Sequence, residues 1–217
     1  QKCSAASRAY LPRSLWNKLL DRLLADINEI KVGPVDDFSC FMNAVINKDA
    51  YNKIKGYIEY AKSQGVKIIG GKCEDALGYF IYPTIIIVED PYFRTMCEEI
   101  FGPVISIYVY DDSKYEEILE VVDRTSPYGL TGSIFARDRK AIQIALDKLY
   151  YSAGNFYIND KPTGAIVNQQ PFGGGRWSGT NDKAGSYLNL LRWVTPRSIK
   201  ENFLPPKNFK YPFMLPD

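Results

Sequence analysis

The sequence predicts an α/β protein whose mainly parallel sheet is flanked by helices, and two observations support that class. Strand-like and helix-like segments alternate along most of the chain, which is typical of parallel sheets built from strand–helix–strand units. Residues 84–88 form a continuous aliphatic run, as expected of a strand buried on both faces. After Trp193 the chain becomes irregular and proline-rich, so we expect a domain over residues 1–193 and an oligomerisation arm over 194–217.

Two helices are predicted in the first third of the chain. Leucines and Ile27 recur along one stripe of residues 14–30, which is the spacing of an amphipathic helix. A second helix covers about residues 49–63 and stops at Gly65, because glycine readily takes the left-handed backbone that follows many helices.

Two further helices are predicted from the residues that begin them. Ser113 and Glu116 have the spacing of a capping box, which would start a helix through Asp123. Asp138 is a good N-cap for a helix that runs to about Tyr151. The predicted strands are residues 66–69, 84–88, 104–110, 130–136 and 156–158, and a glycine-rich loop follows over 163–185.

Size and charge exclude several kinds of partner. With 217 residues, the chain can hold one full core or one domain with an arm. Its net charge of +2 is too balanced for a nucleic-acid-binding surface to be expected. No apolar stretch is long enough to span a bilayer. Neither nucleic acid nor a membrane is therefore predicted as a partner.

The absence of histidine restricts the chemistry that the chain can perform. Cys–His and Ser–His–Asp mechanisms within this chain are excluded, as are most transition-metal sites. The four cysteines are scattered and form no C-x-x-C pair, which argues against a zinc site or a disulfide framework and favours reduced thiols in an intracellular compartment. We predict no metal site, and any thiol chemistry would use carboxylates, backbone dipoles or groups outside the chain.

Cys3 is the candidate nucleophile. The ordinary interpretation of a single cysteine is a small buried apolar residue, and on its own it is the more frequent one. The small residues 4–6 that follow Cys3 change that balance, because they suit a helix N-terminus. The free N–H groups of such a terminus stabilise a thiolate, and they can also hold an oxyanion on a carbonyl that the sulfur attacks.

Two downstream stretches each have a functional and an ordinary interpretation. Glu99 precedes Phe101 by two positions; the carboxylate can accept hydrogen bonds from a ribose diol, and the ring can pack on a nicotinamide. On the residues alone, a solvated acidic pair and a core phenylalanine before a turn are favoured. Phe172 precedes two glycines that allow a tight turn into a pocket, although an ordinary loop explains them equally well. The three glycines and arginine at 173–176 could suggest a phosphate-binding loop, but no lysine followed by serine or threonine stands at the spacing that such a loop requires.

Together and in this order, these stretches resemble the aldehyde dehydrogenase superfamily. Residues 1–4 (Gln-Lys-Cys-Ser) are similar to its nucleophile motif, and residues 98–103 (Glu-Glu-Ile-Phe-Gly-Pro) resemble a highly specific superfamily signature. A closer resemblance, over nearly the whole chain, is to the delta-1-pyrroline-5-carboxylate dehydrogenase branch. It is carried by residues 128–132, 154–161, 163–167 and 169–174.

The resemblance implies the fold of the family's catalytic domain and a defined reaction. Members of this branch oxidise L-glutamate gamma-semialdehyde to L-glutamate with NAD, in proline catabolism. Cys3 would attack the aldehyde to give a thiohemiacetal, with the oxyanion held partly by its own backbone N–H. Hydride would leave to NAD, and water would hydrolyse the resulting thioester. Glu99 matches the glutamate that holds the nicotinamide ribose, and Phe101 lies beside it.

The resemblance also implies a set of substrate-binding residues, namely Ser4, Gly164, Ala165 and Phe172. The turn at Gly164 and Ala165 would offer backbone N–H groups to the substrate α-carboxylate. Phe172 would pack on the aliphatic part of the substrate. Some members carry serine where this chain has Ala165, which bears on affinity more than on identity. We expect the Cys3 sulfur to face a cleft that Ala165 and Phe172 help to line.

Other parts of the enzyme are expected outside this chain. In the family, the NAD-binding domain, the glutamate that activates water and the asparagine of the oxyanion hole precede the nucleophile. We therefore expect a catalytic-domain fragment without full activity on its own, whose partners are the missing N-terminal domain and further copies of the chain. The resemblance places it in the mitochondrial matrix. Residues 182–188 depart from the Gly-Pro-rich segment expected there. The alternative is a non-enzymatic binding or assembly module with the same fold.

Overall fold

The computed structural model describes residues 1–215, and its largest sheet has four strands in the order β1–β6–β5–β2. These strands are β1 (Arg8–Pro12), β2 (Lys67–Ile69), β5 (Thr84–Val88) and β6 (Val104–Tyr110). Strands β1, β6 and β5 are parallel, and β2 pairs antiparallel with β5. The fold is therefore α/β with a mainly parallel sheet, which confirms the predicted class.

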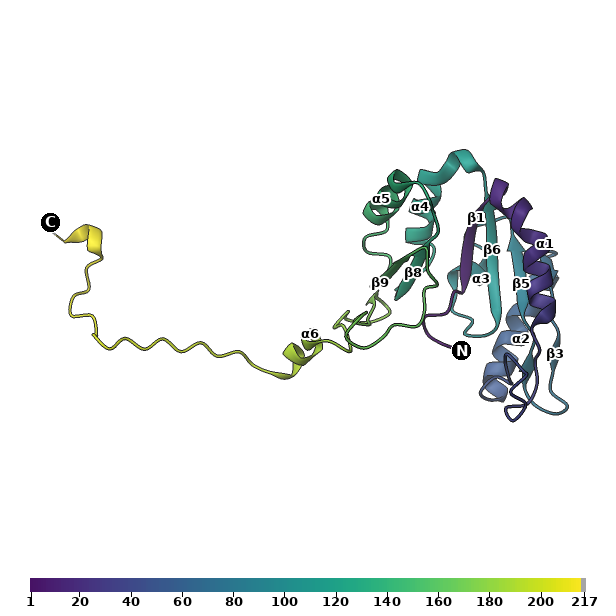
Figure 1. Cartoon of the computed structure of the whole chain (residues 1–217), viewed down its shortest axis with the longest axis horizontal. Coiled ribbons are helices and arrows are strands. Elements are labelled where there is room, and N and C mark those ends of the chain that lie inside the picture. Colours follow the sequence, from purple (N-terminus) through teal and green to yellow (C-terminus); the bar gives the residue numbers. More distant parts are fainter. Residues whose placement is uncertain (216–217) are drawn as a thin grey trace.

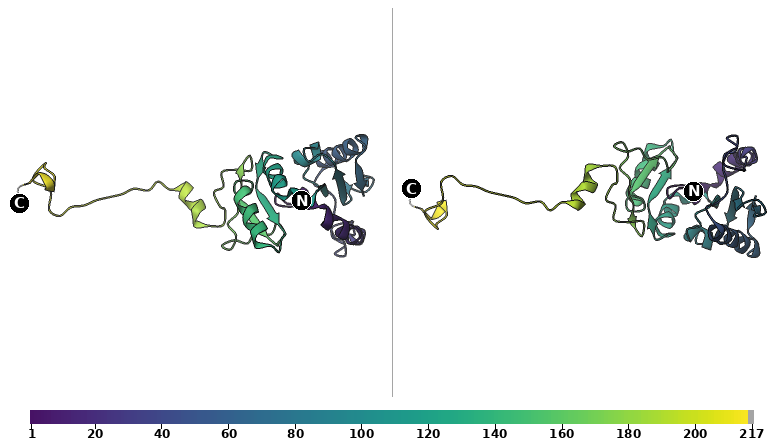
Figure 2. Two further views of the ribbon diagram at one scale, coloured as in Figure 1. Left: turned by 90° about the horizontal axis from the view of Figure 1, so that it is seen from above. Right: turned by 90° about the horizontal axis from the view of Figure 1, so that it is seen from below.

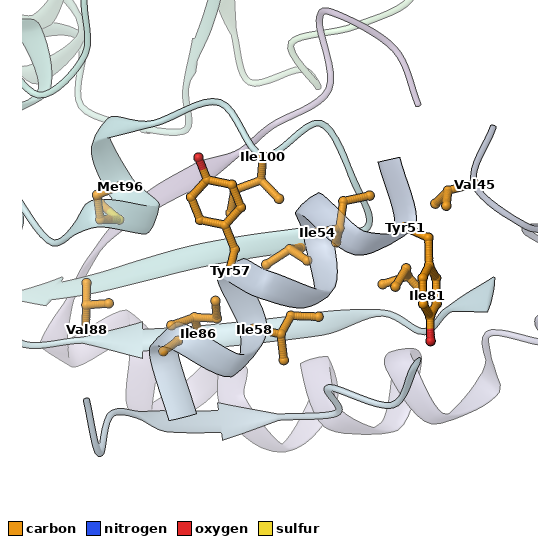
Figure 3. Close-up of a cluster of buried hydrophobic side chains, with 12 residues drawn as sticks. Val45, Tyr51, Ile54, Tyr57, Ile58, Ile81, Ile86, Val88, Met96 and Ile100 are labelled. Carbon is orange, nitrogen blue, oxygen red and sulfur yellow. The ribbon is translucent and has the colours of Figure 1, made fainter. Parts of the chain in front are cut away.

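Helices cover both faces of this sheet. Consecutive residues of β5 show the two sides, because neighbouring strand residues point to opposite faces. Ile86 is buried in a cluster with α2 (Lys48–Ser63), whereas Ile85 packs with Trp16 of α1 (Arg13–Glu29). Figure 3 shows α2 in front of the sheet with its isoleucines directed at the strands, and α1 behind it.

A second, two-stranded sheet lies next to β1 (Figure 1). It consists of β8 (Thr131–Ile134) and β9 (Asn155–Ile158), which are parallel. Two helices, α4 (Tyr115–Arg124) and α5 (Arg139–Lys148), pack against each other and against this small sheet. The buried residues of their cluster are Leu119, Ala145 and Leu149.

The other elements are short. They are the strands β3 (Cys73–Glu74), β4 (Phe80–Ile81), β7 (Tyr128–Gly129) and β10 (Gly175–Arg176), the helices α3 (Arg94–Cys97) and α6 (Tyr187–Leu190), and the 3-10 turns η1 (Asp112–Lys114), η2 (Leu191–Trp193) and η3 (Pro212–Met214). Strand β3 pairs with β4 and β10 with β7, both antiparallel. Strand β10 lies inside the predicted glycine-rich loop, which is otherwise irregular as expected.

The C-terminal segment extends away from the body of the molecule after α6, as both views of Figure 2 show. It carries large apolar side chains that face solvent, among them Trp193 (81% exposed), Phe203 and Phe209. Residues 194–215 are irregular apart from one 3-10 turn, and residues 216–217 of the predicted arm lie outside the described part. The arm's role in oligomerisation stays a prediction. Among residues 1–215, no helix has both the length and the apolar character that crossing a membrane requires.

The predicted helices and strands lie close to their observed positions. The short helices α3 and α6 and the short strands β3, β4, β7 and β10 were not predicted, and three further differences follow. The predicted capping box is wrong: the Asp111 side chain accepts from the Ser113 amide and starts a 3-10 turn, and α4 begins only at Tyr115. The helix predicted to reach Tyr151 ends at Lys148. Strand β1 was not predicted, because its five residues are only partly buried and lie directly before a strongly periodic helix.

Candidate active site

Cys3 lies in a turn at the start of the chain, with its side chain exposed. The Ala5 amide donates to the Lys2 carbonyl at 3.1 Å and closes this turn. The helix N-terminus expected after Cys3 is wrong, because the chain continues into β1 and the first helix starts at Arg13. The Cys3 backbone N–H has no hydrogen-bond partner among residues 1–215, so one donor remains free beside the sulfur.

Cys3 lines a cleft of about 510 Å³ between the large and the small sheet. Its walls come from β1, α4 and β8, together with the segment that precedes β1. Glu98 and Glu99 enter the same cleft from the loop before β6, and they are its only acidic side chains among the described residues. The fold therefore brings the Cys3 thiol and Glu99, which lie far apart in the sequence, into one cleft.

Glu99 and Phe101 form a compact unit. The Phe101 amide donates to Glu99 Oε1 at 3.0 Å, and Lys53 Nζ donates to the Glu99 carbonyl at 2.8 Å. Phe101 has a φ of +59°, which is strained for an aromatic residue. The residue is 48% exposed, so the ordinary interpretation of a core phenylalanine is wrong. The second oxygen of Glu99 has no hydrogen-bond partner in the described chain and is free to accept one from a ligand.

Glu98 has a different environment from its neighbour. Tyr57 donates its hydroxyl to Glu98 Oε2 at 2.5 Å, and Arg94 Nε donates to both carboxylate oxygens at 3.1 Å. The Tyr57 hydrogen bond, with a further contribution from Arg94, holds the pKa of Glu98 below its ordinary value against the opposing effect of burial. Glu98 is thus held by hydrogen bonds within the protein, whereas one oxygen of Glu99 has no partner and can accept a hydrogen bond from a ligand.

Ser4 fastens the thiol segment to the rest of the molecule. The residue is buried, and its Oγ lies 2.8 Å from Oγ1 of Thr163. Its carbonyl accepts a hydrogen bond from the Thr131 hydroxyl at 3.3 Å. Ser4 therefore ties Cys3 both to β8 and to the residue immediately before Gly164.

Gly164 is exposed and Ala165 is partly buried, and both lie in the irregular segment before the turn at residues 167–169. Gly164 has a φ of +89°, in the left-handed region that glycine favours. The backbone N–H groups of both residues have no partner among residues 1–215. The Ile166 amide donates to Gln170 Oε1 at 3.1 Å, which braces the next part of the loop. Two adjacent amides without partners are donors that an anionic ligand can accept from.

Phe172 is held to Ala184 by a pair of backbone hydrogen bonds of 2.9 and 2.7 Å, and this bridge crosses the glycine-rich loop. The predicted substrate residues Gly164, Ala165 and Phe172 do not line the cleft that contains Cys3. The cleft that contains Cys3 thus does not extend to Ala165 or Phe172, and their joint role in substrate binding stays a prediction. The link between them runs through the contact of Ser4 with Thr163.

Asn155 and Gly154, which sequence reasoning missed, position the Phe172 loop. Asn155 Nδ2 donates to the Pro171 carbonyl at 3.1 Å, and its Oδ1 accepts from the Gly173 amide at the same distance. A Cβ on Gly154 would lie 1.9 Å from the Gly173 carbonyl oxygen, so the backbones touch there. The sequence signal that could have pointed to Asn155 is an amide side chain at the start of a strand, because an asparagine buried there needs hydrogen-bond partners.

Lys183 completes this support. Its Nζ donates to the Gly154 carbonyl at 2.6 Å, and burial lowers the pKa of its ammonium group. The residue belongs to the segment 182–188 whose sequence departs from the expected one. No group of three or more histidine, cysteine, aspartate or glutamate side chains that could hold a metal ion occurs within residues 1–215.

Known proteins resemble this chain over most or all of its length. A family model described as the aldehyde dehydrogenase family matches residues 1–196. The chain belongs to the aldehyde dehydrogenase family. It is 58% identical to the mitochondrial delta-1-pyrroline-5-carboxylate dehydrogenase of Dictyostelium discoideum and 51% identical to that of Homo sapiens. The matches cover 99% of this chain but 39% and 38% of those relatives.

A solved structure with the same architecture supports the family assignment. It is the Delta-pyrroline-5-carboxylate dehydrogenase from Mycobacterium tuberculosis bound with NAD and cobalamin, at a TM-score of 0.87 and 49% sequence identity. The match covers 99% of this chain and 40% of that one. The chain thus spans about two fifths of the length of the family members that it matches.

Proposed function

We propose that this chain is the catalytic portion of an NAD-dependent aldehyde dehydrogenase that oxidises L-glutamate gamma-semialdehyde to L-glutamate in proline catabolism. The observation that carries the proposal is the placement of the Cys3 thiol and Glu99 in one cleft. The similarity to enzymes of that name in Dictyostelium discoideum and Homo sapiens supports the substrate. Residues 1–193 would form the domain, and residues 194–217 would be an oligomerisation arm.

The residues near the cleft fit one end of NAD. The free oxygen of Glu99 suits the ribose diol next to the nicotinamide, and the half-exposed Phe101 ring lies on the same short turn. The similar enzyme from Mycobacterium tuberculosis is described as bound with NAD, which supports the same cofactor here. When bound, NAD would accept the hydride that leaves the substrate carbon.

The chain's own residues would perform the covalent part of the reaction. The Cys3 thiolate attacks the aldehyde carbon, forming a carbon–sulfur bond and an oxyanion. The free Cys3 backbone N–H donates to that oxyanion. The unpaired amides of Gly164 and Ala165 bind the substrate α-carboxylate, and Phe172 packs on its methylene groups. Ser4 fixes the distance between the thiol and that turn.

The groups needed for rapid turnover are incomplete. Hydrolysis of a thioester at Cys3 needs a base. Among residues 1–215, the only carboxylates in the cleft are those of Glu98, which is engaged by Tyr57 and Arg94, and Glu99, which would face the cofactor. We therefore propose that this chain alone has little dehydrogenase activity and requires the part that longer relatives possess. The name of the similar Dictyostelium protein supports residence in mitochondria, where this chain would act.

The test measures NADH formation from the semialdehyde by the chain alone and after mixing with the rest of the Dictyostelium relative. The chain alone should be slower than the intact relative by a factor of about a hundred or more. The mixture should regain activity, and Cys3→Ala should abolish it. A mixture that associates but remains inactive contradicts the proposed function.

Assembly without catalysis is the second candidate function, and the exposed aromatic side chains of the C-terminal segment favour it. Light scattering of the chain and of a form ending at residue 193 separates the two. Under the assembly function the chain would form oligomers that the shortened form does not, and Cys3→Ala would have no effect on any property of the complemented mixture.

A further inference from the structure

The small sheet of β8 and β9 (Figure 1) has an apolar face and a polar face. Ile134 and Phe156 pack with the buried cluster of α4 and α5. Neighbouring residues of a strand point to opposite faces, so Thr131 and Asn155 point away from that cluster. Thr131 is paired with Asn155 in the β8–β9 ladder. The two side chains therefore lie next to each other on the polar face of the small sheet.

Thr131 holds the segment that carries the thiol. Its hydroxyl donates to the Ser4 carbonyl at 3.3 Å, and Ser4 directly follows Cys3. Ser4 is itself buried, so this hydrogen bond lies inside the protein. It sets the position of the thiol segment relative to the small sheet, one residue away from the sulfur.

Asn155 holds the loop that carries Phe172. Its Nδ2 donates to the Pro171 carbonyl and its Oδ1 accepts from the Gly173 amide, both at 3.1 Å. These partners are the residues directly before and after Phe172. Because Asn155 is buried and uses both its donor and its acceptor here, it holds the backbone at Phe172 from both sides.

Lys183 restrains the same loop from a second direction. Its Nζ donates to the Gly154 carbonyl at 2.6 Å and to the Gly173 carbonyl at 3.4 Å. The amide of Gly173 is thus engaged by Asn155 and its carbonyl by Lys183. A shift of the loop along β9 would break these hydrogen bonds together, so the loop has one closely defined position on the strand.

Two paired residues therefore connect the thiol with the Phe172 loop. The thiol segment is joined to Thr131, and Thr131 is paired with Asn155, which holds the loop. Under the proposed function, Cys3 attacks the aldehyde carbon while Phe172 packs on the methylene groups of the substrate. The separation of Cys3 and Phe172 must then match the number of methylene groups. One methylene too many or too few in an apolar site changes kcat/KM by a factor of about ten to two hundred.

We propose that Asn155, together with Thr131, is a specificity-determining positioning residue that selects aldehydes by chain length. It holds Phe172 at the distance from Cys3 that suits L-glutamate gamma-semialdehyde. Asn155 itself touches no substrate, because its amide group is used by Pro171 and Gly173. The inference rests on the proposed function and adds to it the means by which the substrate is distinguished from shorter and longer homologues.

The kinetic test uses the mixture of the chain with the rest of the Dictyostelium relative. The mixture is supplied with NAD and, in turn, with the semialdehydes of aspartate, glutamate and 2-aminoadipate, each longer than the one before by one methylene. Asn155→Ala should lower the preference for the glutamate semialdehyde, measured as a ratio of kcat/KM values, by a factor of about five or more. A variant that merely folds less well lowers all three rates by the same factor and leaves the ratio unchanged. An unchanged ratio overturns the proposal.

Asn43→Ala is the matched control. The Asn43 amide donates to the carbonyls of Gly33 and Pro34 at 3.0 and 3.2 Å, so its loss also removes two hydrogen bonds to the backbone, but in the loop before α2. Its ratio should equal that of the unmodified chain, and a ratio lowered as much as in Asn155→Ala overturns the proposal. Should Asn155→Ala not fold, Lys183→Met removes the ammonium that holds Gly173 and should lower the ratio; an unchanged ratio there overturns the proposal too.

Hydrogen exchange of the chain alone gives a readout that does not depend on activity. The Gly173 amide should exchange faster by a factor of about ten in Asn155→Ala and at the unmodified rate in Asn43→Ala. Unchanged exchange in Asn155→Ala overturns the proposal. If the mixture associates but oxidises none of the three semialdehydes, the proposed function fails and the selection by chain length fails with it. If the mixture oxidises the glutamate semialdehyde and Asn155→Ala keeps the ratio, only the selection by chain length fails.

Discussion

Residues 84–110, which carry Glu99 and Phe101, lie against an aliphatic core, whereas residues 163–185, which carry the proposed substrate residues, are held mainly by polar contacts. Ile86 of the first region is fully buried, and Ile166 of the second is 54% exposed. The loop instead depends on hydrogen bonds from Asn155, Lys183 and Gln170. Residues 84–110 are thus held in place by many van der Waals contacts, and residues 163–185 by a few hydrogen bonds.

The same substitution in the two regions should show this difference most strongly. Ile86→Ala leaves a cavity between α2 and the sheet and should lower the free energy of unfolding by about 2–5 kcal/mol. Ile166→Ala removes an exposed side chain and should change it by less than about 0.5 kcal/mol. Urea unfolding followed by circular dichroism measures both values. Similar losses for the two variants would contradict the comparison.

A single added methyl group should damage the second region at its closest backbone contact. Gly154→Ala places a Cβ 1.9 Å from the Gly173 carbonyl oxygen, where no side chain can move aside. The strain should cost about 1–3 kcal/mol and displace the Phe172 loop. Gly175→Ala is the matched control, because no atom lies within 4 Å of its Cβ position.

Thermal unfolding gives the stability of both glycine variants, and hydrogen exchange over residues 170–174 reports on the loop. Faster exchange is expected in Gly154→Ala only. If Gly175→Ala loses as much thermal stability and exchanges as fast as Gly154→Ala, the loop tolerates no added side-chain volume at either position. The close contact with Gly173 would then not explain the effect.

The first region was largely predictable from sequence, because its physics is local and periodic. The aliphatic run at residues 84–88 and the stripe on residues 14–30 predict a strand and a helix at nearly their observed positions. The exposed position of Phe101 was not predictable in this way, because it lies in a turn with a positive φ whose hydrogen bonds involve the Glu99 carboxylate and Lys53 of the distant helix α2.

The second region was predictable only as a loop. Its residues have no periodicity, and its shape depends on contacts with residues far away in sequence, such as that of Ser4 with Thr163. The glycines at 173 and 174 were expected to allow a tight turn, yet their φ angles are not in the left-handed region. A Cβ at Gly174 would instead lie 2.7 Å from the Cα of Leu130, so close backbone packing explains that glycine.

The link between the two ends of the site offers a smaller, more specific test. Thr163→Val keeps the shape of the side chain but leaves the buried Ser4 hydroxyl without its partner, at a cost of about 1 kcal/mol. Hydrogen exchange at the Ala5 amide should become faster, and the rate of Cys3 alkylation by iodoacetamide should change. Thr163→Ser retains a hydroxyl and should restore both readouts. If valine and serine behave alike, Ser4 does not position the thiol.

The smallest expected effect concerns the dependence of stability on pH at Glu98. Its carboxylate is stabilised in the folded state by Tyr57 and Arg94, so its pKa is lower when folded than when unfolded. The resulting stability is fully present above the unfolded pKa of about 4.3, and it is lost as the pH falls through the lower folded pKa. Because the Glu98 side chain is about half exposed, solvent screening limits the contribution to less than about 1 kcal/mol.

Glu98→Gln keeps an acceptor for Tyr57 but removes the charge. Between about pH 6 and about pH 3, a range that includes the ordinary glutamate pKa of about 4.3, the stability of this variant should fall less than that of the unmodified chain. Glu201→Gln is the control, since Glu201 lies exposed on the C-terminal segment and has no hydrogen-bond or ion-pair partner within residues 1–215. Urea unfolding across this range measures the difference. If the stability of Glu98→Gln depends on pH in the same way as that of the unmodified chain, Tyr57 and Arg94 stabilise this carboxylate no better than solvent does. The packed region would then owe its position to its aliphatic core alone.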